Sequence, residues 1–196
     1  MIDTHAVPWR LIAITDDLRD GVDGLVARAC SAQRGGATML LLRLKHFDAQ
    51  SLMPIARALV SALTIPVVVS ERLDVALGSG AAGVHLTSGS VPVVAARPHV
   101  PSGFLIGGSV SVEADLGGAQ LADYVTIGPV FGSGTASIGV EGFRRLATAC
   151  GQPAIAVGGI DAQSAALLRA AGAAGVAVIR TVLGAADPAA AAALLV

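Results

Sequence analysis

The stretch RAAGAAGVAVI, residues 169–179, joins a segment of small residues to an apolar run through two glycines. A helix that ends on a small residue and glycine, and then turns directly into an apolar strand, is typical of the short connection in a repeated β/α unit. The same pattern of glycine and small residues before an apolar run occurs in GSGAAGVHL, residues 78–86, and in GGAT, residues 35–38. This recurrence predicts a chain built from equivalent β/α units.

Outward from these stretches, hydrophobic periodicity predicts eight strands that alternate with helices. The strands are expected at residues 11–15, 38–43, 66–70, 82–86, 104–109, 123–127, 153–157 and 174–179. The helices are expected at residues 22–34, 48–63, 72–79, 91–97, 112–120, 140–150, 161–171 and 187–195. Eight such units predict an α/β fold, a single compact (β/α)8 TIM barrel that occupies residues 1–196 as one domain. A doubly wound open sheet is the alternative, but it would need fewer strands and one point of reversal.

The composition agrees with this fold and narrows the function. Of the 196 residues, 54% are hydrophobic and only 3% aromatic, which suits small side chains packed between helices and central strands. The net charge of −1 and the lack of basic clusters argue against a nucleic-acid partner. No apolar run free of glycine reaches the roughly 18 residues of a membrane span, and no secretory signal is evident. We expect a cytoplasmic protein with a small-molecule substrate, and a homo-oligomer is compatible with the sequence.

Two cations follow the second expected strand. In LLLRLKHF, Arg43 and Lys45 stand two residues apart, so their side chains are expected on one face of the strand. They form a plausible clamp for phosphate or pyrophosphate. The alternative is a solvated strand end paired to acids such as Glu71. In a barrel, this end of the strands is where chemistry takes place.

A second anion site is predicted after the last two strands. In AIAVGGIDAQSA, residues 154–165, Gly158 and Gly159 lie between an apolar run and the start of a helix. Glycines there permit close approach to the backbone, and the free N–H groups of a following helix favour an anion. The alternative is only a tight turn. The Gly- and Ser-rich loop GPVFGSGTASIG, residues 128–139, and the start of AVIRTVLG, with Arg180, favour a phosphate site.

Other polar residues near the strand ends allow two interpretations. His85 ends the fourth expected strand, where it could act as a general base, although we favour a structural role. Asp16 and Asp17 could bind a metal, but neighbouring residues on an extended chain point apart and can simply cap the following turn.

The motifs, taken in order, resemble those of the thiamine phosphate synthase superfamily, which includes the thiazole tautomerase TenI. The resemblance covers nearly the whole chain and rests on LIAITD, LRLK, SERLDVAL, GAAGVHL, GGSVS, ADYVTIGPVFGSGTAS, AIAVGGI and GAAGVAVI. It implies a (β/α)8 barrel that joins hydroxymethylpyrimidine pyrophosphate to a thiazole phosphate with Mg²⁺ and releases pyrophosphate.

The resemblance also implies roles for individual residues. The residues expected to bind the pyrimidine substrate and its pyrophosphate are Arg43, Lys45 and Ser109. Ser70 is a further candidate for substrate binding. Those expected to bind the thiazole phosphate are Ser133, Gly134, Thr135, Gly158, Gly159, Ile179 and Arg180. The catalytic candidates are Glu71, His85 and Ser109, and Glu71 is also the candidate metal ligand.

Several positions depart from the family pattern. The synthases carry Gln where this chain has Leu41, Asn-Asp where it has Ser70-Glu71, Asp where it has Ser90, and Lys where it has Ala136. The segment LTSGSVP, residues 86–92, is closer to the tautomerase branch, but that branch has a catalytic His where this chain has Ser111. Three functions follow: a synthase, including a weak or altered one; a TenI-like tautomerase that works without Mg²⁺; and a non-catalytic binder of a thiazole or thiamine phosphate.

Overall fold

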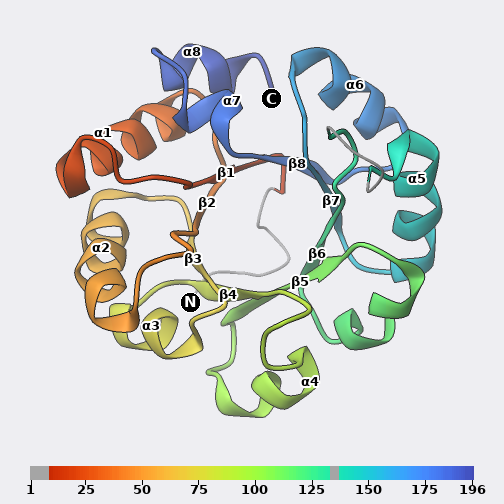
Figure 1. Cartoon of the computed structure of the whole chain (residues 1–196), viewed down its shortest axis with the longest axis horizontal. Helices are drawn as coiled ribbons and strands as arrows, with labels where there is room; N and C mark the ends of the chain where they lie inside the picture. The colour runs from red at the N-terminus through yellow and green to blue at the C-terminus, as the bar shows by residue number, and fades with distance from the viewer. Residues whose placement is uncertain (1–8, 133–136) are drawn as a thin grey trace.

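A computed structural model describes residues 9–132 and 137–196 as a closed barrel of eight parallel strands (Figure 1). The strands are β1 (Leu11–Ile14), β2 (Met39–Leu42), β3 (Val67–Ser70), β4 (Gly83–Leu86), β5 (Leu105–Val110), β6 (Tyr124–Ile127), β7 (Ala154–Val157) and β8 (Gly175–Val178). Each strand pairs with the next in sequence order, and β8 pairs with β1. The predicted α/β barrel is therefore confirmed, and the open sheet is wrong.

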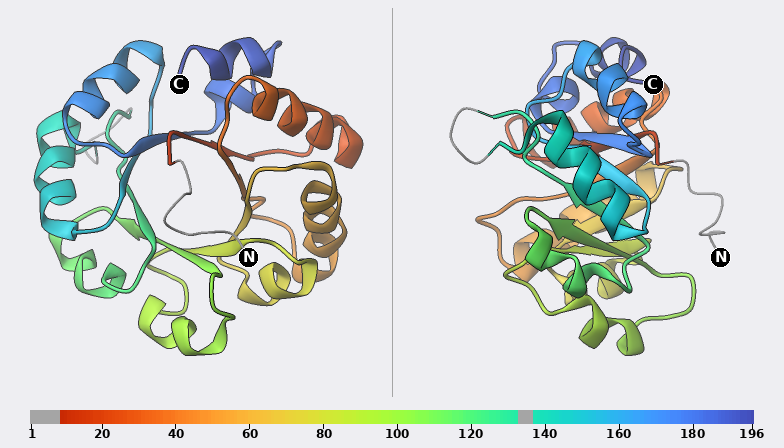
Figure 2. Two further views of the ribbon diagram at one scale, coloured as in Figure 1. Left: turned by 180° about the vertical axis from the view of Figure 1, so that it is seen from behind. Right: turned by 90° about the vertical axis from the view of Figure 1, so that its right-hand side faces the viewer.

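Helices surround the barrel on its outside, as the views from behind and from the side also show (Figure 2). They are α1 (Gly21–Arg34), α2 (Ala49–Ala62), α3 (Leu73–Ser79), α4 (Val93–Ala96), α5 (Gly139–Cys150), α6 (Ala162–Ala170), α7 (Arg180–Leu183) and α8 (Pro188–Ala193). In the described part of the chain, no helix is long and apolar enough to span a membrane.

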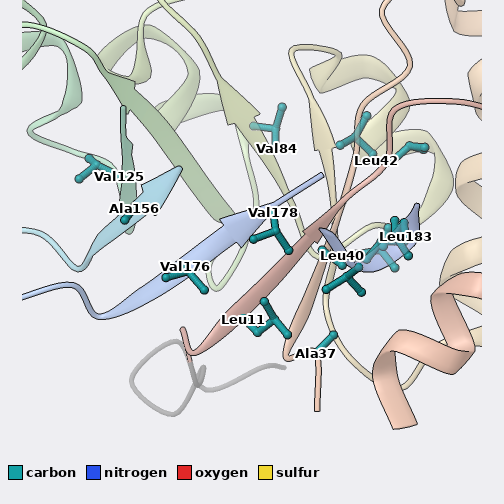
Figure 3. Packing of buried hydrophobic residues seen from close by; sticks show 14 of the residues in the cluster. Leu11, Ala37, Leu40, Leu42, Val84, Val125, Ala156, Val176, Val178 and Leu183 are labelled. Carbon is teal, nitrogen blue, oxygen red and sulfur yellow. The ribbon is translucent and has the colours of Figure 1, made fainter. Parts of the chain in front are cut away.

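The strands bury both faces, and the two faces form two separate apolar layers. On β1, Leu11 and Ala13 belong to the larger cluster between strands and helices. Ile12 and Ile14 belong to the smaller cluster inside the barrel. This follows from the period of two along a strand. Figure 3 shows part of the larger cluster, with Leu11 on β1 near side chains of β2 and β8.

Two predicted helices are wrong in extent. Residues 91–97 form only the one-turn α4, followed by the 3-10 turn η1 (Arg97–His99), because Pro98 lacks the N–H group that a continuing helix would use. Residues 112–120 form the 3-10 turns η2 (Glu113–Asp115) and η3 (Gly117–Ala119) instead of a helix. Glycines 117 and 118 are poor helix formers, and they fall at the centre of that segment.

Candidate active site

The backbone of Arg43, directly after β2, is fixed by the side chain of Thr15, directly after β1. The buried hydroxyl of Thr15 accepts a hydrogen bond from the backbone N of Arg43 at 2.7 Å and donates one to the backbone O of Arg43 at 3.1 Å. The Arg43 guanidinium lies 3.4 Å from the carboxylate of Asp16. The acid that pairs with Arg43 is thus Asp16, and not the Glu71 that the alternative interpretation named.

A cavity of about 200 Å³ lies between the ends of β2 and β3. Four of the predicted site residues line it, namely Arg43, Lys45, Ser70 and Glu71. Lys45 is exposed, and within residues 9–132 and 137–196 no carboxylate lies at ion-pair distance from its ammonium group. The cavity therefore combines Lys45, the carboxylate of Glu71, and two arginines, Arg43 and Arg72, which pair with Asp16 and Asp74.

Glu71 adopts an unusual backbone conformation at this cavity. Its φ of 65° falls in the left-handed region, which a residue other than glycine occupies at a cost of about 1 kcal/mol or more. Its backbone N donates to the backbone O of His85 at 2.8 Å, which ties the turn after β3 to β4. Its carboxylate accepts a hydrogen bond from the Thr87 hydroxyl, and the Thr87 hydroxyl lies 3.3 Å from that of Ser90. Glu71 and Ser90, which replace two acids of the family pattern, are therefore joined through one threonine.

His85 points into the barrel, where it is 4% exposed. Its Nδ1 lies 3.2 Å from the Tyr124 hydroxyl, and its Nε2 lies 3.0 Å from the Ser109 hydroxyl and 3.2 Å from the Thr126 hydroxyl. Burial lowers the pKa of His85 to about 4 and raises the pKa of Tyr124, because both lack solvent around their charged forms. His85 is thus a neutral imidazole with both ring nitrogens hydrogen-bonded. It is linked through Ser109 to the mouth of the barrel, the end at which the strands reach their carboxyl termini.

The two glycines after β7 have a structural reason as well as a chemical one. Gly158 and Gly159 have φ values of 101° and 67°, which favour glycine. A Cβ on Gly159 would collide with the carbonyl oxygen of Phe131, and the backbone N of Phe131 donates to the backbone O of Gly158 at 2.9 Å. The bare backbone thus lets the turn after β7 pack directly on the loop after β6.

Two predicted phosphate ligands follow β8. Ile179 is half-buried, and the exposed Arg180 is the first residue of α7. Among the described residues, no carboxylate forms an ion pair with Arg180. Ser133, Gly134 and Thr135, together with Ala136, lie outside the described residues.

A second cavity, of about 230 Å³, lies beside the ends of β4 and β5. Ser109 and Ser90 contribute to its wall, so it adjoins the network of Glu71 and Thr87. Ser111, at the position of the tautomerase histidine, is exposed, and its backbone N donates to the carboxylate of Asp115 at 2.7 Å.

A resident metal site is not apparent in this mouth. Across residues 9–132 and 137–196, no group of three or more histidine, cysteine, aspartate or glutamate side chains is arranged to hold a metal ion. Glu71 contributes one carboxylate, with the hydroxyls of Thr87 and Ser90 beside it. Mg²⁺ is commonly held by one or two carboxylates together with substrate phosphates and water. The donor set therefore fits a Mg²⁺ ion that arrives with a phosphorylated substrate.

Tyr124 and Thr126 are neighbours of His85 that sequence reasoning missed. They stand two residues apart on β6, so both point into the barrel, where they meet His85. Tyr124 is the only tyrosine in a chain with few aromatic residues. A lone phenol and a hydroxyl on one face of an otherwise apolar strand were the available signal.

Comparisons with known proteins identify the family and agree with the fold. The family model described as "Thiamine monophosphate synthase" matches residues 11–182. A thiamine-phosphate synthase of Methanoculleus marisnigri is 41% identical, over 94% of this chain and 92% of that protein. A thiamine-phosphate synthase of Albidiferax ferrireducens is 36% identical, over 95% of this chain and 90% of that protein. The solved thiamine phosphate pyrophosphorylase of Pyrococcus furiosus superposes with a TM-score of 0.85 and 31% identity, over 96% of this chain and 94% of that one. The chain therefore belongs to the thiamine monophosphate synthase family, and it is thiamine phosphate synthase-like in sequence and fold.

Proposed function

We propose that this protein is a thiamine phosphate synthase that joins hydroxymethylpyrimidine pyrophosphate to a thiazole phosphate and releases pyrophosphate. The observation that carries the proposal is the cavity between β2 and β3, which Arg43, Lys45, Ser70 and Glu71 line together. Relatives called thiamine-phosphate synthase, at 34–41% identity, support the same reaction. We also propose that residues 1–196 act as one domain.

In this proposal, Arg43 and Lys45 bind the pyrophosphate group. Negative charge grows on the pyrophosphate oxygens as the bond between the pyrophosphate and the methylene carbon of the pyrimidine substrate breaks. Fixed cations stabilise that charge. The guanidinium presents a planar pair of donors, whereas the ammonium acts as a point charge. Asp16 offsets part of the charge of Arg43, so the unpaired Lys45 supplies the larger share of the attraction.

Mg²⁺ has a restricted place in this site. When bound, it would neutralise negative charge on the pyrophosphate. Glu71 would hold it, with the hydroxyls of Thr87 and Ser90 nearby and the substrate oxygens completing its shell. With one carboxylate in place of two, we expect a weaker requirement for Mg²⁺ than in a synthase with both.

The thiazole phosphate is assigned to the opposite side of the mouth. Gly158, Gly159, Ile179 and Arg180 would bind it, together with the segment 133–135, which lies outside the described residues. The Arg180 guanidinium, which forms no ion pair within residues 9–132 and 137–196, supports this assignment.

Two other functions remain as alternatives. A TenI-like tautomerase needs a group that moves a proton at the mouth, but Ser111 is a poor base, and His85 is buried with both ring nitrogens hydrogen-bonded. A non-catalytic binder of a thiazole or thiamine phosphate is favoured by one observation: among the described residues, Glu71 is the only carboxylate that lines the cavity between β2 and β3. Formation of thiamine phosphate by the purified protein would exclude this alternative.

The first experiment uses the fact that Lys45 is the only lysine in the sequence. An amine-acylating reagent followed by mass spectrometry reports on this side chain directly, with the N-terminal amine as an internal reference. We expect pyrophosphate to protect Lys45, and sulfate at the same ionic strength to protect it much less. Equal labelling of Lys45 with and without pyrophosphate would refute the assignment of this cavity.

The second experiment measures thiamine phosphate formation with and without Mg²⁺. Loss of a charge-assisted hydrogen bond costs about 1.5 to 3 kcal/mol, so Lys45→Ala should lower kcat/KM by roughly 10- to 100-fold. Arg144→Ala, which removes an exposed cation on α5, is the matched control and should leave activity within about twofold. Ser90→Asp, which adds a carboxylate next to Thr87, should strengthen the response to Mg²⁺. A wild-type protein that forms no product, with or without Mg²⁺, would contradict the synthase assignment.

A further inference from the structure

A column of polar side chains crosses the otherwise apolar interior of the barrel. From the mouth inward it contains Ser109 on β5, His85 on β4 and Tyr124 on β6, with Thr126 beside the first two. The imidazole and phenol rings lie 5.5 Å apart at 28°, and the Trp9 ring lies 4.9 Å from that of Tyr124, tilted by 33°. Of these groups only Ser109 adjoins one of the cavities at the mouth.

The barrel makes room for this column at Gly107. A Cβ at this position would collide with the Tyr124 ring and with Nδ1 of His85. Gly107 also pairs in register with both His85 and Tyr124, so it separates the two strands that carry them. The glycine on β5 therefore brings the phenol within hydrogen-bond distance of the imidazole.

The hydrogen-bonding capacity of Tyr124 decides the tautomer of His85. Tyr124 is 0% exposed, and the only partner of its hydroxyl in the described part of the chain is Nδ1 of His85. If Nδ1 carried the proton, the phenolic O–H would be buried without an acceptor, at a cost of about 1 to 3 kcal/mol. If Nε2 carries the proton, the phenol donates to Nδ1 and both groups are satisfied.

The same count of donors and acceptors then determines the hydrogen bonds of the Ser109 hydroxyl. With its proton on Nε2, His85 donates to Ser109 at 3.0 Å. The Thr126 hydroxyl lies 3.3 Å from that of Ser109, and either group could be the donor. If Ser109 donated, the proton of the buried Thr126 hydroxyl would have no acceptor among the described residues, so Thr126 is assigned as the donor. A serine oxygen accepts two hydrogen bonds and donates one. Both acceptor positions of Ser109 are filled, and its own proton is left for the mouth.

We propose that Tyr124 and His85 are positioning residues that make Ser109 an obligate hydrogen-bond donor toward the substrate, matched to an acceptor-only group such as a pyrophosphate oxygen. The inference rests on the proposed function, because it takes the group that meets Ser109 to be phosphorylated. Each donor in the chain polarises the next, so the direction of all its hydrogen bonds favours negative charge at the mouth.

The first test needs no ligand. Long-range ¹H–¹⁵N spectra distinguish the two neutral tautomers of histidine, and comparison with His85→Gln assigns the His85 signals. We expect the proton on Nε2 in the wild-type protein and a loss of this preference in Tyr124→Phe. A wild-type protein with its proton on Nδ1 would overturn the inference, whatever the protein binds.

The second test is a double-mutant cycle on pyrophosphate affinity. We expect Ser109→Ala to weaken binding by about tenfold and Tyr124→Phe by about threefold to tenfold, with the double variant no weaker than Ser109→Ala alone. Ile155→Val is the matched control, since it removes one methyl group from the same interior layer and no polar atom, and its affinity should be unchanged. If Tyr124→Phe weakened binding equally with and without Ser109, its role would be structural and the inference would fail. Failure of the wild-type protein to bind pyrophosphate would refute the proposed function. The tautomer spectra would still test the direction of the hydrogen bonds, because they need no ligand.

Discussion

The buried imidazole of His85 makes the stability of this barrel depend on pH in a narrow range. The ordinary pKa of 6.5 is retained in the unfolded chain, whereas burial lowers the pKa in the folded protein to about 4. The unfolded state therefore binds the proton first as the pH falls, so the free energy of unfolding decreases from about pH 6.5 down to about pH 4. The difference between the two pKa values corresponds to roughly 3 kcal/mol. That is a large share of the 5 to 15 kcal/mol of a typical domain.

The assay is urea denaturation at several pH values between 7 and 4, for the wild-type protein and for His85→Gln. Three carboxylates, Asp48, Asp74 and Asp161, have pKa values lowered by hydrogen bonds, so their contributions are lost only below about pH 4. The pH range in which His85 changes the stability therefore lies above the range in which these carboxylates do. We expect the wild-type protein to lose stability above pH 4 and the variant to lose much less. Parallel curves for the two proteins would refute the assignment of this pH dependence to His85.

Three further substitutions test the packing around the mouth, each by urea denaturation. Gly159→Ala should cost about 2 to 4 kcal/mol, because its φ of 67° and the carbonyl of Phe131 both oppose a Cβ; a cost below about 1 kcal/mol would show that the turn relaxes freely. Gly107→Ala should cost about 1 to 3 kcal/mol by pushing Tyr124 aside, and wild-type stability in this variant would contradict the tight fit. Asp161→Ala should cost about 1 kcal/mol through loss of the cap of α6, with Asp161→Asn as a control that keeps most of it.

The fold was predictable because its strands are short, apolar and rich in valine, leucine and isoleucine. Strand β3, within VVVS, could be recognised without any long-range information. The segments after β4 and β5 were not predicted correctly, since an apolar spacing in each suggested a helix. Pro98 and the pair Gly117 and Gly118 locally override that spacing.

The candidate site was predictable in part. The expectation that Arg43 and Lys45 would share one face used only the spacing along a strand, and both residues line one cavity. The partners of these residues depend on the register between strands, which a single sequence does not reveal. Asp16 reaches Arg43 only because β1 and β2 are neighbours, and the neighbours of His85 come from two other strands.

The seam between β8 and β1 places the first and last strands of the barrel side by side. Leu11 pairs in register with Val176, so the ring closes only when β8 has left the ribosome. Contacts between such distant parts of a chain are slow to form, which makes closure a late step of folding. Arg180 follows β8 and Asp16 follows β1, and Asp16 in turn meets Arg43 after β2. The two substrates proposed to bind at Arg180 and Arg43 would lie on either side of this seam, so their joint binding would also stabilise the closed ring.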